Sequence, residues 1–349
     1  MEYKSILVSW LFETDLTNMN AGEGSSNLKE IKTYNNGLPY ISGQSMRHAL
    51  RQAMKRENPN EFKCTPEYPC GDIENCWTCD LFGFLIPKKG SKRWSPIKAS
   101  PALGQIRYPL VTDLIFRMVE DIKCPNCESK IYPLSAREGT SEISQGKDLK
   151  CPECGEKFSA PYDIRQALAH KQLIKNIYKS SISIDLYHIG LEEVPKISND
   201  DNIMVGMEEL ISIDDDKRIE RAIQILNGIY NLADFANQSR EMVNGSPDFV
   251  IIGLQKQYNQ RLASVLKLDE SGNIDTNILE SVINDVLAIN ENKIYAGYIS
   301  GVINNESEVK NVLEYFDNDD SNQFELCNTP RETFNKVIND LSGDNSGGS

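Results

Sequence analysis

Residues Leu38–Arg56, LPYISGQSMRHALRQAMKR, combine a short extended run with a helix that begins directly after Ser42-Gly43. Ser42 or Ser45 can cap this helix, and the apolar residues that follow recur at helical spacing. These apolar residues are Met46, Leu50, Ala53 and Met54. The stretch therefore predicts a strand, a tight turn and a helix with one buried face.

The same helix carries a concentration of positive charge. Arg47 and Arg51 lie four residues apart and so share one helix face. A helix N-terminus offers free N–H groups and a partial positive charge, and Gly43 lets another backbone approach closely. His48, Lys55 and Arg56 add to the charge. The stretch therefore suits a chain of phosphates, although an ordinary amphipathic helix with a solvated basic face fits the spacing equally well.

The chain has 349 residues, so we expect either one core with large insertions or two domains. Its 40% hydrophobic and 25% charged residues are typical of a soluble globular protein. Apolar runs stay well below the roughly 20 residues that a membrane crossing needs, and no signal peptide precedes the first expected strand. We therefore expect a cytoplasmic protein, with residues 343–349 (GDNSGGS) as a linker or tag remnant.

The formal net charge of −14 argues at first against a nucleic-acid partner. The charge is not evenly spread: residues 192–216 hold −8 and residues 305–349 hold −7, which leaves the remainder at +1. Fields between exposed charges act over about 10 Å at moderate salt. A basic groove can therefore operate on this acidic chain.

Eight of the nine cysteines fall in two clusters, which favours metal sites over disulfides in a reducing compartment. Two CPxC turns with 23 residues between them predict a structural zinc ribbon, with ligands Cys124, Cys127, Cys151 and Cys154. A C-x5-C-x5-C-x2-C run predicts a second Zn2+ site at Cys64, Cys70, Cys76 and Cys79, with free thiols as the alternative. Cys327 stands alone, and we expect it to be buried.

The pattern along the rest of the chain predicts an α+β fold with an antiparallel sheet. We expect strands at Tyr3–Asp15, Ile106–Met118, Ser180–Gly190, Pro247–Leu254 and Lys293–Ile299. We expect helices at Tyr162–Tyr178, Asp216–Asn237, Asp275–Ile289 and Pro330–Leu341. The acidic stretch Glu192–Asp216 contains a hairpin tip at Ile203–Met207.

Catalytic motifs are absent from the sequence. The three histidines, His48, His170 and His188, have no recognisable nucleophile partner, and there is no P-loop, GxGxxG or HExxH. The loop acids Asp15 and Glu23 could serve a metal or an RNA hydroxyl, but single loop carboxylates are weak evidence of catalysis. We therefore do not expect an enzyme.

The basic turn Lys88–Trp94, with Lys89 and Arg93, ends in an aromatic ring. Cations beside a stacking surface suit RNA or DNA, and a solvated loop is the equal alternative.

The chain resembles the backbone subunit of type I CRISPR effector (Cascade) complexes, in the DevR-like type I-B branch of the RAMP superfamily. The segments that carry the resemblance keep a common order from about residue 3 to 255. They are Ser5–Thr14, Asn20–Gly24, Ile41–Arg47 with Leu50-Arg51, Asp80–Gly83, Ser183–Leu186, Ala236–Arg240 and Ser246-Pro247. The two cysteine clusters are additions that many members of the family lack.

The resemblance implies a modified RRM/ferredoxin-like palm with large finger and thumb insertions. The implied domains are palm at 1–57, 161–191 and 217–342, a Cys-rich finger at 58–160, and an acidic thumb at 192–216. The partners would be CRISPR guide RNA, target DNA through the guide, copies of the chain in a helical filament, and other Cascade subunits. A free zinc-ribbon interaction module and a type III-like subunit that cleaves target RNA with a loop carboxylate are the alternatives.

The resemblance also implies which residues meet the guide. Gly43, Ser45, Arg47 and Arg51 would contact its phosphates, with Asn18, Asn20, Asn237 and Arg240 lining the same groove. Met204 and Met207 would form the thumb wedge that displaces a nucleotide. Such a protein would hold phosphate and sugar and leave sequence to base pairing.

Overall fold

The computed structural model describes residues 2–20, 28–117, 122–131, 145–146, 148–161, 167–198, 203–289, 291–319 and 321–343. The chain divides into two compact units. The larger comprises Met1–Ala21, Ile31–Pro109 and Ile174–Ser349, and the smaller comprises Gly22–Glu30 and Leu110–Leu173. The domain boundaries expected from the sequence remain a prediction.

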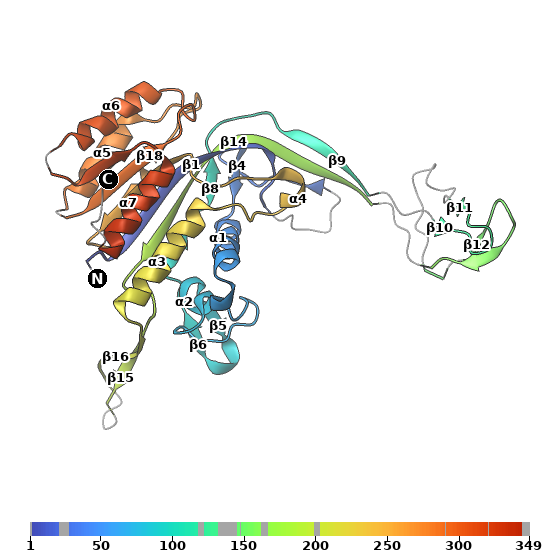
Figure 1. The fold of residues 1–349 in the computed structure, drawn as a ribbon, viewed down its shortest axis with the longest axis horizontal. Helices are drawn as coiled ribbons and strands as arrows, with labels where there is room; N and C mark the ends of the chain where they lie inside the picture. The colour runs from blue at the N-terminus through green and yellow to red at the C-terminus, as the bar shows by residue number, and fades with distance from the viewer. Residues whose placement is uncertain are drawn as a thin grey trace. The chain divides into compact units, whose positions relative to one another are not determined.

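The larger unit is built around β1 (Ser5–Thr17), which lies between β14 (Ala167–Asp185) and β17 (Phe249–Gln255) and runs antiparallel to both (Figure 1). The sheet continues past β17 through β18 (Lys293–Tyr298) to the parallel edge strand β19 (Phe324–Cys327). On the other side, β14 pairs with β7 (Ile97–Ala99) and β8 (Ala102–Gly104). Beyond β8 come β4 (Leu38–Ile41) and β3 (Thr33–Tyr34). The expected antiparallel sheet in an α+β fold is confirmed.

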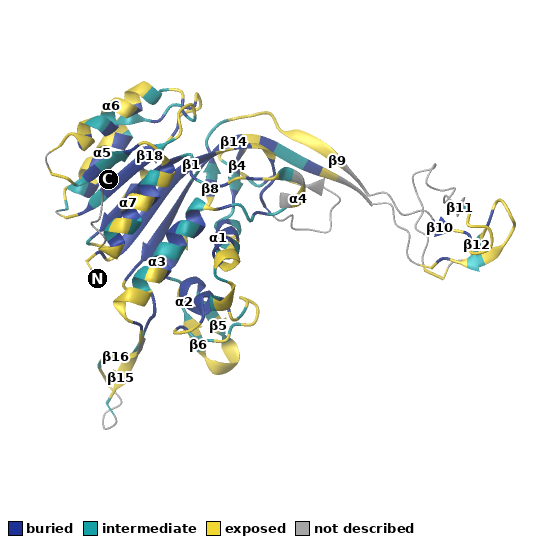
Figure 2. Cartoon of the chain, viewed as in Figure 1, coloured by how far each residue is buried: buried dark blue, intermediate teal, exposed yellow. Residues whose placement is uncertain are grey.

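Both faces of β1 are buried, as the dark central strands of Figure 2 show. Successive side chains of a strand point to opposite faces, so a strand with apolar residues at nearly every position must be covered on both sides. Ile6, Val8, Trp10 and Phe12 belong to one core cluster, whereas Leu7 and Leu11 belong to another. The expectation that this strand is central is confirmed, and its aromatic rings are core residues.

Helices cover both faces of the sheet. On the face of Trp10 lie α1 (Gly43–Glu57), α3 (Asp215–Tyr230) and α7 (Pro330–Ser342). On the face of Leu7 lie η4 (Arg261–Ser264), α5 (Thr276–Leu287) and α6 (Glu306–Asp317). Gly228 lets α1 and α3 approach, because a Cβ there would come within 2.7 Å of Met54 Cγ.

Several short elements project from this sheet and its helices (Figure 1). Between α1 and β7 come η1 (Pro59–Glu61), α2 (Trp77–Phe82), β5 (Phe84–Ile86), η2 (Pro87–Lys89) and β6 (Ser91–Arg93). Between β14 and α3, β15 (Leu191–Ile197) pairs with β16 (Met204–Ser212) as a hairpin. The hairpin is as expected, but the tip predicted at Ile203–Met207 is wrong, because Met204–Met207 pair along strand β16. The four-residue α4 (Gln238–Glu241) follows α3.

The smaller unit contains two structured parts. β2 (Leu28–Lys29) and β9 (Val111–Arg117) pair with the first residues of β14. Two short hairpins hold the second cysteine cluster: β10 (Ile122–Lys123) with β11 (Lys130–Ile131), and β12 (Asp148–Lys150) with β13 (Lys157–Ser159).

The helix expected at Tyr162–Tyr178 is wrong, because the described part of this segment belongs to strand β14. The expectation relied on Lys171, Lys175 and Lys179, which are spaced by four. Four is also twice the strand period, so the spacing does not distinguish the two structures. His170 accordingly lies on β14 rather than in a helix.

The remaining elements match the sequence more closely. Helices α5 and α7 and strands β17 and β18 lie within two residues of their expected bounds. Helix α3, in contrast, ends at Tyr230 rather than at Asn237. α6 and β19 were not anticipated. Cys327 is buried, as expected. None of the helices in the described part of the chain has the length and hydropathy that a membrane crossing requires.

Lys179 provides a test of the β14 assignment. Burial, together with the charge of Lys267, lowers its pKa from 10.5 to about 8. The unfolded chain therefore binds more protons between these two pH values, and stability rises with pH across that window. Lys179→Met should stabilise the fold at pH 7 by at most about 3 kcal/mol. This gain in the free energy of unfolding, measured by urea titration, should shrink as the pH rises towards 10.5.

Lys175→Met is the matched control on the same strand. Lys175 is half-exposed and pairs with Glu13 at 2.8 Å, so its loss should cost no more than about 1 kcal/mol. A destabilised Lys179→Met variant, or equal pH dependence in both variants, would contradict the burial of Lys179 on the sheet.

Candidate nucleic-acid interface

The N-terminus of α1 is capped as the sequence predicts. Ser42 is extended (φ −64°, ψ 146°), and its side chain accepts a hydrogen bond from the Ser45 N–H. Gly43 lies against the β7–β8 turn, where a Cβ would come 3.0 Å from the Ala99 carbonyl oxygen. The N–H groups of Gly43 and Gln44 have no acceptor among the described residues. They remain available to an anion.

The loop after β1 holds this helix end in place. The Asn20 side chain accepts from the Ser42 N–H at 3.0 Å and donates to the Tyr40 carbonyl at 2.9 Å. The Ser45 hydroxyl donates to the Met19 carbonyl at 2.9 Å. Asn20 is buried and Ser45 is half-buried, so both side chains fix the backbone.

A third segment, far along the chain, joins the same loop. Asn237 adopts a left-handed conformation (φ 66°), and its side chain donates to the Asn18 carbonyl at 2.9 Å. The Glu241 carboxylate accepts from the Asn18 N–H at 2.7 Å. Asn18, Asn20, Gly43, Ser45 and Asn237 are therefore brought together. Arg240 lies on α4, but its side chain falls outside the described part of the structure, as do residues 21–24.

Arg47 is largely committed to the protein itself. Its guanidinium donates to the Phe82 carbonyl at 2.8 Å, to the Ser95 hydroxyl at 3.1 Å and to the Ile97 carbonyl. Burial, together with the neighbouring Arg51, lowers its pKa. Arg47 therefore ties α1 to the segment before β7, which leaves few of its five donors for a phosphate.

Arg51 is freer. Its guanidinium lies over the Phe82 ring at 5.8 Å and donates to His48 Nδ1 at 3.1 Å. Burial, together with the charge of Arg51, lowers the pKa of His48, which keeps the imidazole in the neutral form that can accept this bond. Arg51 therefore presents a stacked, oriented cation beside the helix.

Arg93, which the sequence suggested for nucleic-acid contact, is also engaged. It pairs with the buried Asp80 carboxylate and donates to the carbonyls of Leu191 and His188, each at 2.7 Å. Its side chain is only 9% exposed. Lys89, in contrast, is exposed in the turn between β5 and β6. Of these two basic residues, only Lys89 is free to meet a ligand.

Asp80 is paired from two sides. Besides Arg93, it receives the guanidinium of Arg221 on α3, and its Oδ1 accepts the Gly190 N–H at 2.9 Å. Arg221 also donates to the Ile73 carbonyl at 3.0 Å. A buried carboxylate is tolerated only when it is paired and hydrogen-bonded in this way. The sequence places Asp80 in the segment Asp80–Gly83, but nothing in its spacing indicates the pairing with Arg93 and Arg221.

The hairpin β15–β16 exposes apolar side chains. Met204 is 56% exposed and Met207 is 52% exposed. Both lie on β16, opposite Ile197 and Pro195, rather than at the hairpin tip. Ile203, Val205 and Leu210 are also exposed.

The first cysteine cluster lies at the start of α2. Cys64 Sγ is 3.5 Å from Cys76 Sγ and from Cys79 Sγ, and Cys70 Sγ is 3.6 Å from Cys79 Sγ. The Gly71 N–H donates to Cys79 Sγ at 3.2 Å. The hydrogen bond between Cys76 and Cys79 lowers the pKa of the Cys76 thiol and raises that of Cys79. The Cys76 thiolate is the metal-binding form.

The second cluster has the geometry of paired knuckles. Cys124 Sγ is 3.6 Å from Cys154 Sγ, and Cys127 Sγ is 3.6 Å from Cys151 Sγ. After each CPxC turn comes a residue with positive φ, Glu128 (56°) in one and Gly155 (78°) in the other. The two turns therefore have the same backbone form, each closing a short hairpin.

Both clusters fit a tetrahedral ion. All four sulfurs of each cluster lie within 4.8 Å of one another. Zinc bound to four thiolates at about 2.3 Å places them about 3.8 Å apart. The observed 3.5 to 3.6 Å separations come close to this value and far exceed a disulfide bond of about 2.05 Å. Two four-cysteine clusters able to hold a metal ion are therefore present.

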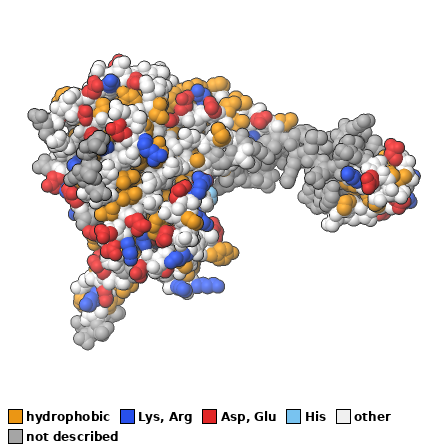
Figure 3. All heavy atoms as spheres, in the orientation of Figure 1, with side chains coloured by type: hydrophobic (Ala, Val, Ile, Leu, Met, Phe, Trp, Pro, Cys, Tyr) orange, Lys and Arg blue, Asp and Glu red, His pale blue; other side chains and the backbone are white. Residues whose placement is uncertain are grey.

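The carboxylates and histidines considered for catalysis do not form a cluster among the described residues. Asp15 is exposed near the end of β1, and Glu23 lies outside the described residues. His188 Nδ1 is bonded to Asp185 at 2.7 Å, in a turn rather than on a strand. On the face of the larger unit in Figure 3, acidic and basic side chains are interspersed without a continuous basic stripe.

Comparisons with known proteins agree with this architecture. A family described as "CRISPR-associated negative auto-regulator DevR/Csa2" matches residues 49–112, from within α1 to the start of β9. The predicted resemblance to the DevR family is confirmed. The DevR match includes Arg51, the first cysteine cluster and Asp80–Gly83. A search of curated proteins finds no match.

Two solved structures share the fold of this chain. A chain of a "CRISPR RNA-guided surveillance complex" aligns with a TM-score of 0.51 and 11% identity, covering 96% of this chain and 98% of that one. A chain of a "CRISPR RNA-guided surveillance complex, pre-nicking" aligns with a TM-score of 0.53 and 8% identity, covering 97% and 100%. At these identities the likeness is one of fold.

The two cysteine clusters should differ in their structural effect. Cys76→Ser with Cys79→Ser should lower the main unfolding temperature, because these thiols flank the start of α2 and so position Asp80. Cys124→Ser with Cys151→Ser should leave that transition unchanged, since those residues belong to the smaller unit.

Elemental analysis and calorimetry provide the measurement. The unmodified chain should carry two zinc ions, one for each cluster, and each double variant should carry one. Metal-free protein with an unchanged melting temperature, or an equal effect of both variants on the main transition, would contradict the assignment.

Proposed function

We propose that this chain is the guide-RNA-binding backbone subunit of a CRISPR surveillance complex of the Cascade type. Copies of it would polymerise along the guide and present the guide for pairing with target DNA. The observation that carries the proposal is the N-terminus of α1. The loop of Asn18 and Asn20, the capped turn at Ser42 and the loop of Asn237 meet there, although they are far apart in the sequence.

The order of elements supports an RRM-like palm. β1, α1, β7–β8, β14, α3 and β17 follow one another as β-α-β-β-α-β, and they lie in the sheet in the order β17-β1-β14-β8. This is the ferredoxin-like arrangement. An RRM stacks bases on the open sheet face, but here α5 and α6 pack against that face of β1 and β17. RNA binding is therefore proposed at the α1 edge, which consists of the loops after β1 and β4 together with the N-terminus of α1.

The chemistry of this edge suits phosphate. The N–H groups of Gly43 and Gln44, which have no acceptor among the residues that the structure describes, lie at the positive end of a helix dipole and can bind an anion without reading a base. Arg51 adds a cation about two helix turns further along α1. A subunit that serves guides of any sequence needs this kind of contact.

Other parts complete the proposed assembly. The hairpin β15–β16 would be the thumb, with exposed Met204 and Met207 as the wedge beside a displaced nucleotide. Lys89 would add charge from the finger. Zinc would stabilise both cysteine clusters. We propose that the subunit is non-catalytic and cytoplasmic, and that cleavage belongs to other members of the complex.

Arg51→Glu tests the proposal. The full chain is expressed with a CRISPR array and its neighbouring genes, and the RNA that co-purifies is sequenced and quantified. We expect guide RNA of uniform length with the wild type and much less with the variant. Binding of all RNA sequences should weaken alike, and the slope of log affinity against log salt should fall by about 1.

Lys55→Glu is the matched control, since Lys55 is exposed in the last turn of the same helix, and it should keep most of the RNA. Arg47 is unsuitable for this test, because its replacement would break three hydrogen bonds within the fold. Absence of RNA from the wild-type complex, or equal RNA content in Arg51→Glu and wild type, would overturn the proposal.

A further inference from the structure

Trp94 stands apart from the other tryptophans. It is 84% exposed, whereas Trp10 is 0% and Trp77 is 3% exposed. Tryptophan is enriched at interfaces, because its ring offers a large apolar contact area and an N–H donor. The surroundings of Trp94 are ordered by hydrogen bonds on both sides.

The residues that flank Trp94 are both fixed. Arg93, before it, makes four hydrogen bonds, to Asp80, Leu191 and His188. Ser95, after it, donates to the Leu81 carbonyl at 2.6 Å and accepts from the Ile97 N–H at 3.0 Å. Gly83 lies so close that a Cβ there would be 2.6 Å from the Arg93 carbonyl oxygen. The indole is therefore presented on a rigid backbone.

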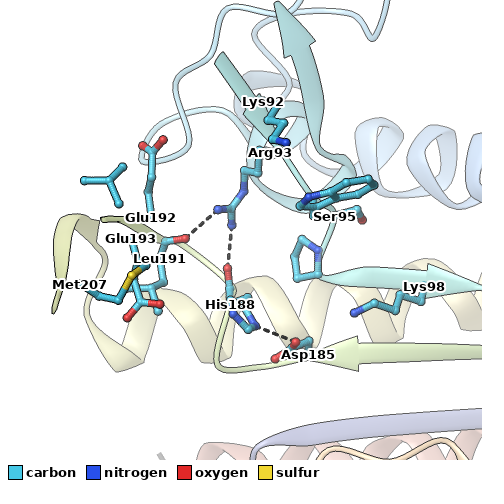
Figure 4. Close-up of a pocket in the computed structure, with 13 residues that line it drawn as sticks. Lys92, Arg93, Ser95, Lys98, Asp185, His188, Leu191, Glu192, Glu193 and Met207 are labelled. Carbon is cyan, nitrogen blue, oxygen red and sulfur yellow. Dashed lines mark hydrogen bonds and ion pairs between the residues drawn. The ribbon is translucent and has the colours of Figure 1, made fainter. Parts of the chain in front are cut away.

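Trp94 lines two neighbouring hollows. One has a volume of about 370 Å³, reaches His188 and Met207, and is shown in Figure 4. The other, of about 640 Å³, reaches Arg47 and Phe84. Arg93, Trp94, Ser95 and Lys98 line both. A chain passing from one hollow to the other would cross the indole.

The charges at this site favour an anionic chain near the indole. Lys92 and Lys98 are exposed, and Lys98 Nζ lies 4.8 Å from the centre of the Tyr258 ring. The nearby acids Asp80 and Asp185 are already bonded, to Arg93 and His188. Figure 4 shows Glu192 and Glu193 beside Leu191 and Met207, on the opposite wall from Lys98. The cations thus lie on the side of β6 and β7.

We propose that Trp94 is a base-stacking platform for one nucleotide of a single-stranded RNA, with Lys98 and Lys92 neutralising its phosphates. Exposed aromatic rings beside cations hold single strands in this way without selecting sequence. The inference rests on the proposed function, and it adds a contact to the base, whereas the α1 edge contacts the backbone. Trp94, at the end of the basic turn Lys88–Trp94, would thus contact the ligand. Arg93 only positions Trp94.

Fluorescence of the full chain, freed of RNA at high salt, tests this proposal. The probe is a short oligouridylate, compared with an abasic ribose-phosphate of the same length. Because Trp10 and Trp77 are buried, the quenchable emission comes from Trp94. The oligouridylate should quench it, and the abasic chain should bind more weakly and quench little.

Three variants separate stacking from other roles. Trp94→Ala should weaken oligouridylate binding by about 5- to 150-fold, which corresponds to one stacked base. Trp94→Phe should keep affinity within a few-fold of the wild type but lose the quenching. Tyr68→Ala, which removes another aromatic ring that is 84% exposed, should change neither.

The outcomes distinguish this proposal from the function it rests on. RNA binding without quenching, and with equal affinity in Trp94→Ala, would overturn the stacking site and leave the proposed function intact. No RNA binding by the wild type would overturn both. If Trp94→Ala reduced self-association but not RNA affinity, the ring would contact protein instead, and the stacking proposal would be wrong.

Discussion

The buried carboxylate of Asp80 is the interaction on which the arrangement of the larger unit depends. It pairs with Arg93 from β6 and Arg221 from α3, and it accepts the Gly190 N–H. Removing it would leave two guanidinium groups buried without a counter-charge, which typically costs about 3 to 5 kcal/mol. One side chain thus joins the cysteine-bearing insertion, the turn after β14 and the helix α3.

The proposed RNA-binding edge inherits its rigidity from this arrangement. The residues that follow Asp80 complete the connection, because the Phe82 carbonyl and ring both meet Arg47 on α1. At its N-terminus the same helix is held by Asn20 through Ser42. A helix fixed at its end and along its side presents its free N–H groups in one position, and a preorganised site binds without the cost of ordering.

The sequence was informative where one periodicity dominated. Continuous apolar residues predicted β1, and capping with helical spacing predicted α1 and its buried face. The lysines of β14 were ambiguous, since a spacing of four fits a helix and a strand alike. α6 could have been found from Val309, Leu313 and Phe316, which are all buried. The bonds that Arg47 and Arg93 make within the fold could not be predicted, because their acceptors are mostly backbone carbonyls, which leave no trace in composition or spacing.

The central claim is that a ribose-phosphate chain lies against the N-terminus of α1. Electron cryomicroscopy of the chain assembled on its guide tests this claim most directly. We expect density for a phosphate within hydrogen-bond distance of the Gly43 and Gln44 N–H groups, beside the loop of Asn18 and Asn20. Density for RNA elsewhere, with this edge covered by another protein surface, would contradict the account.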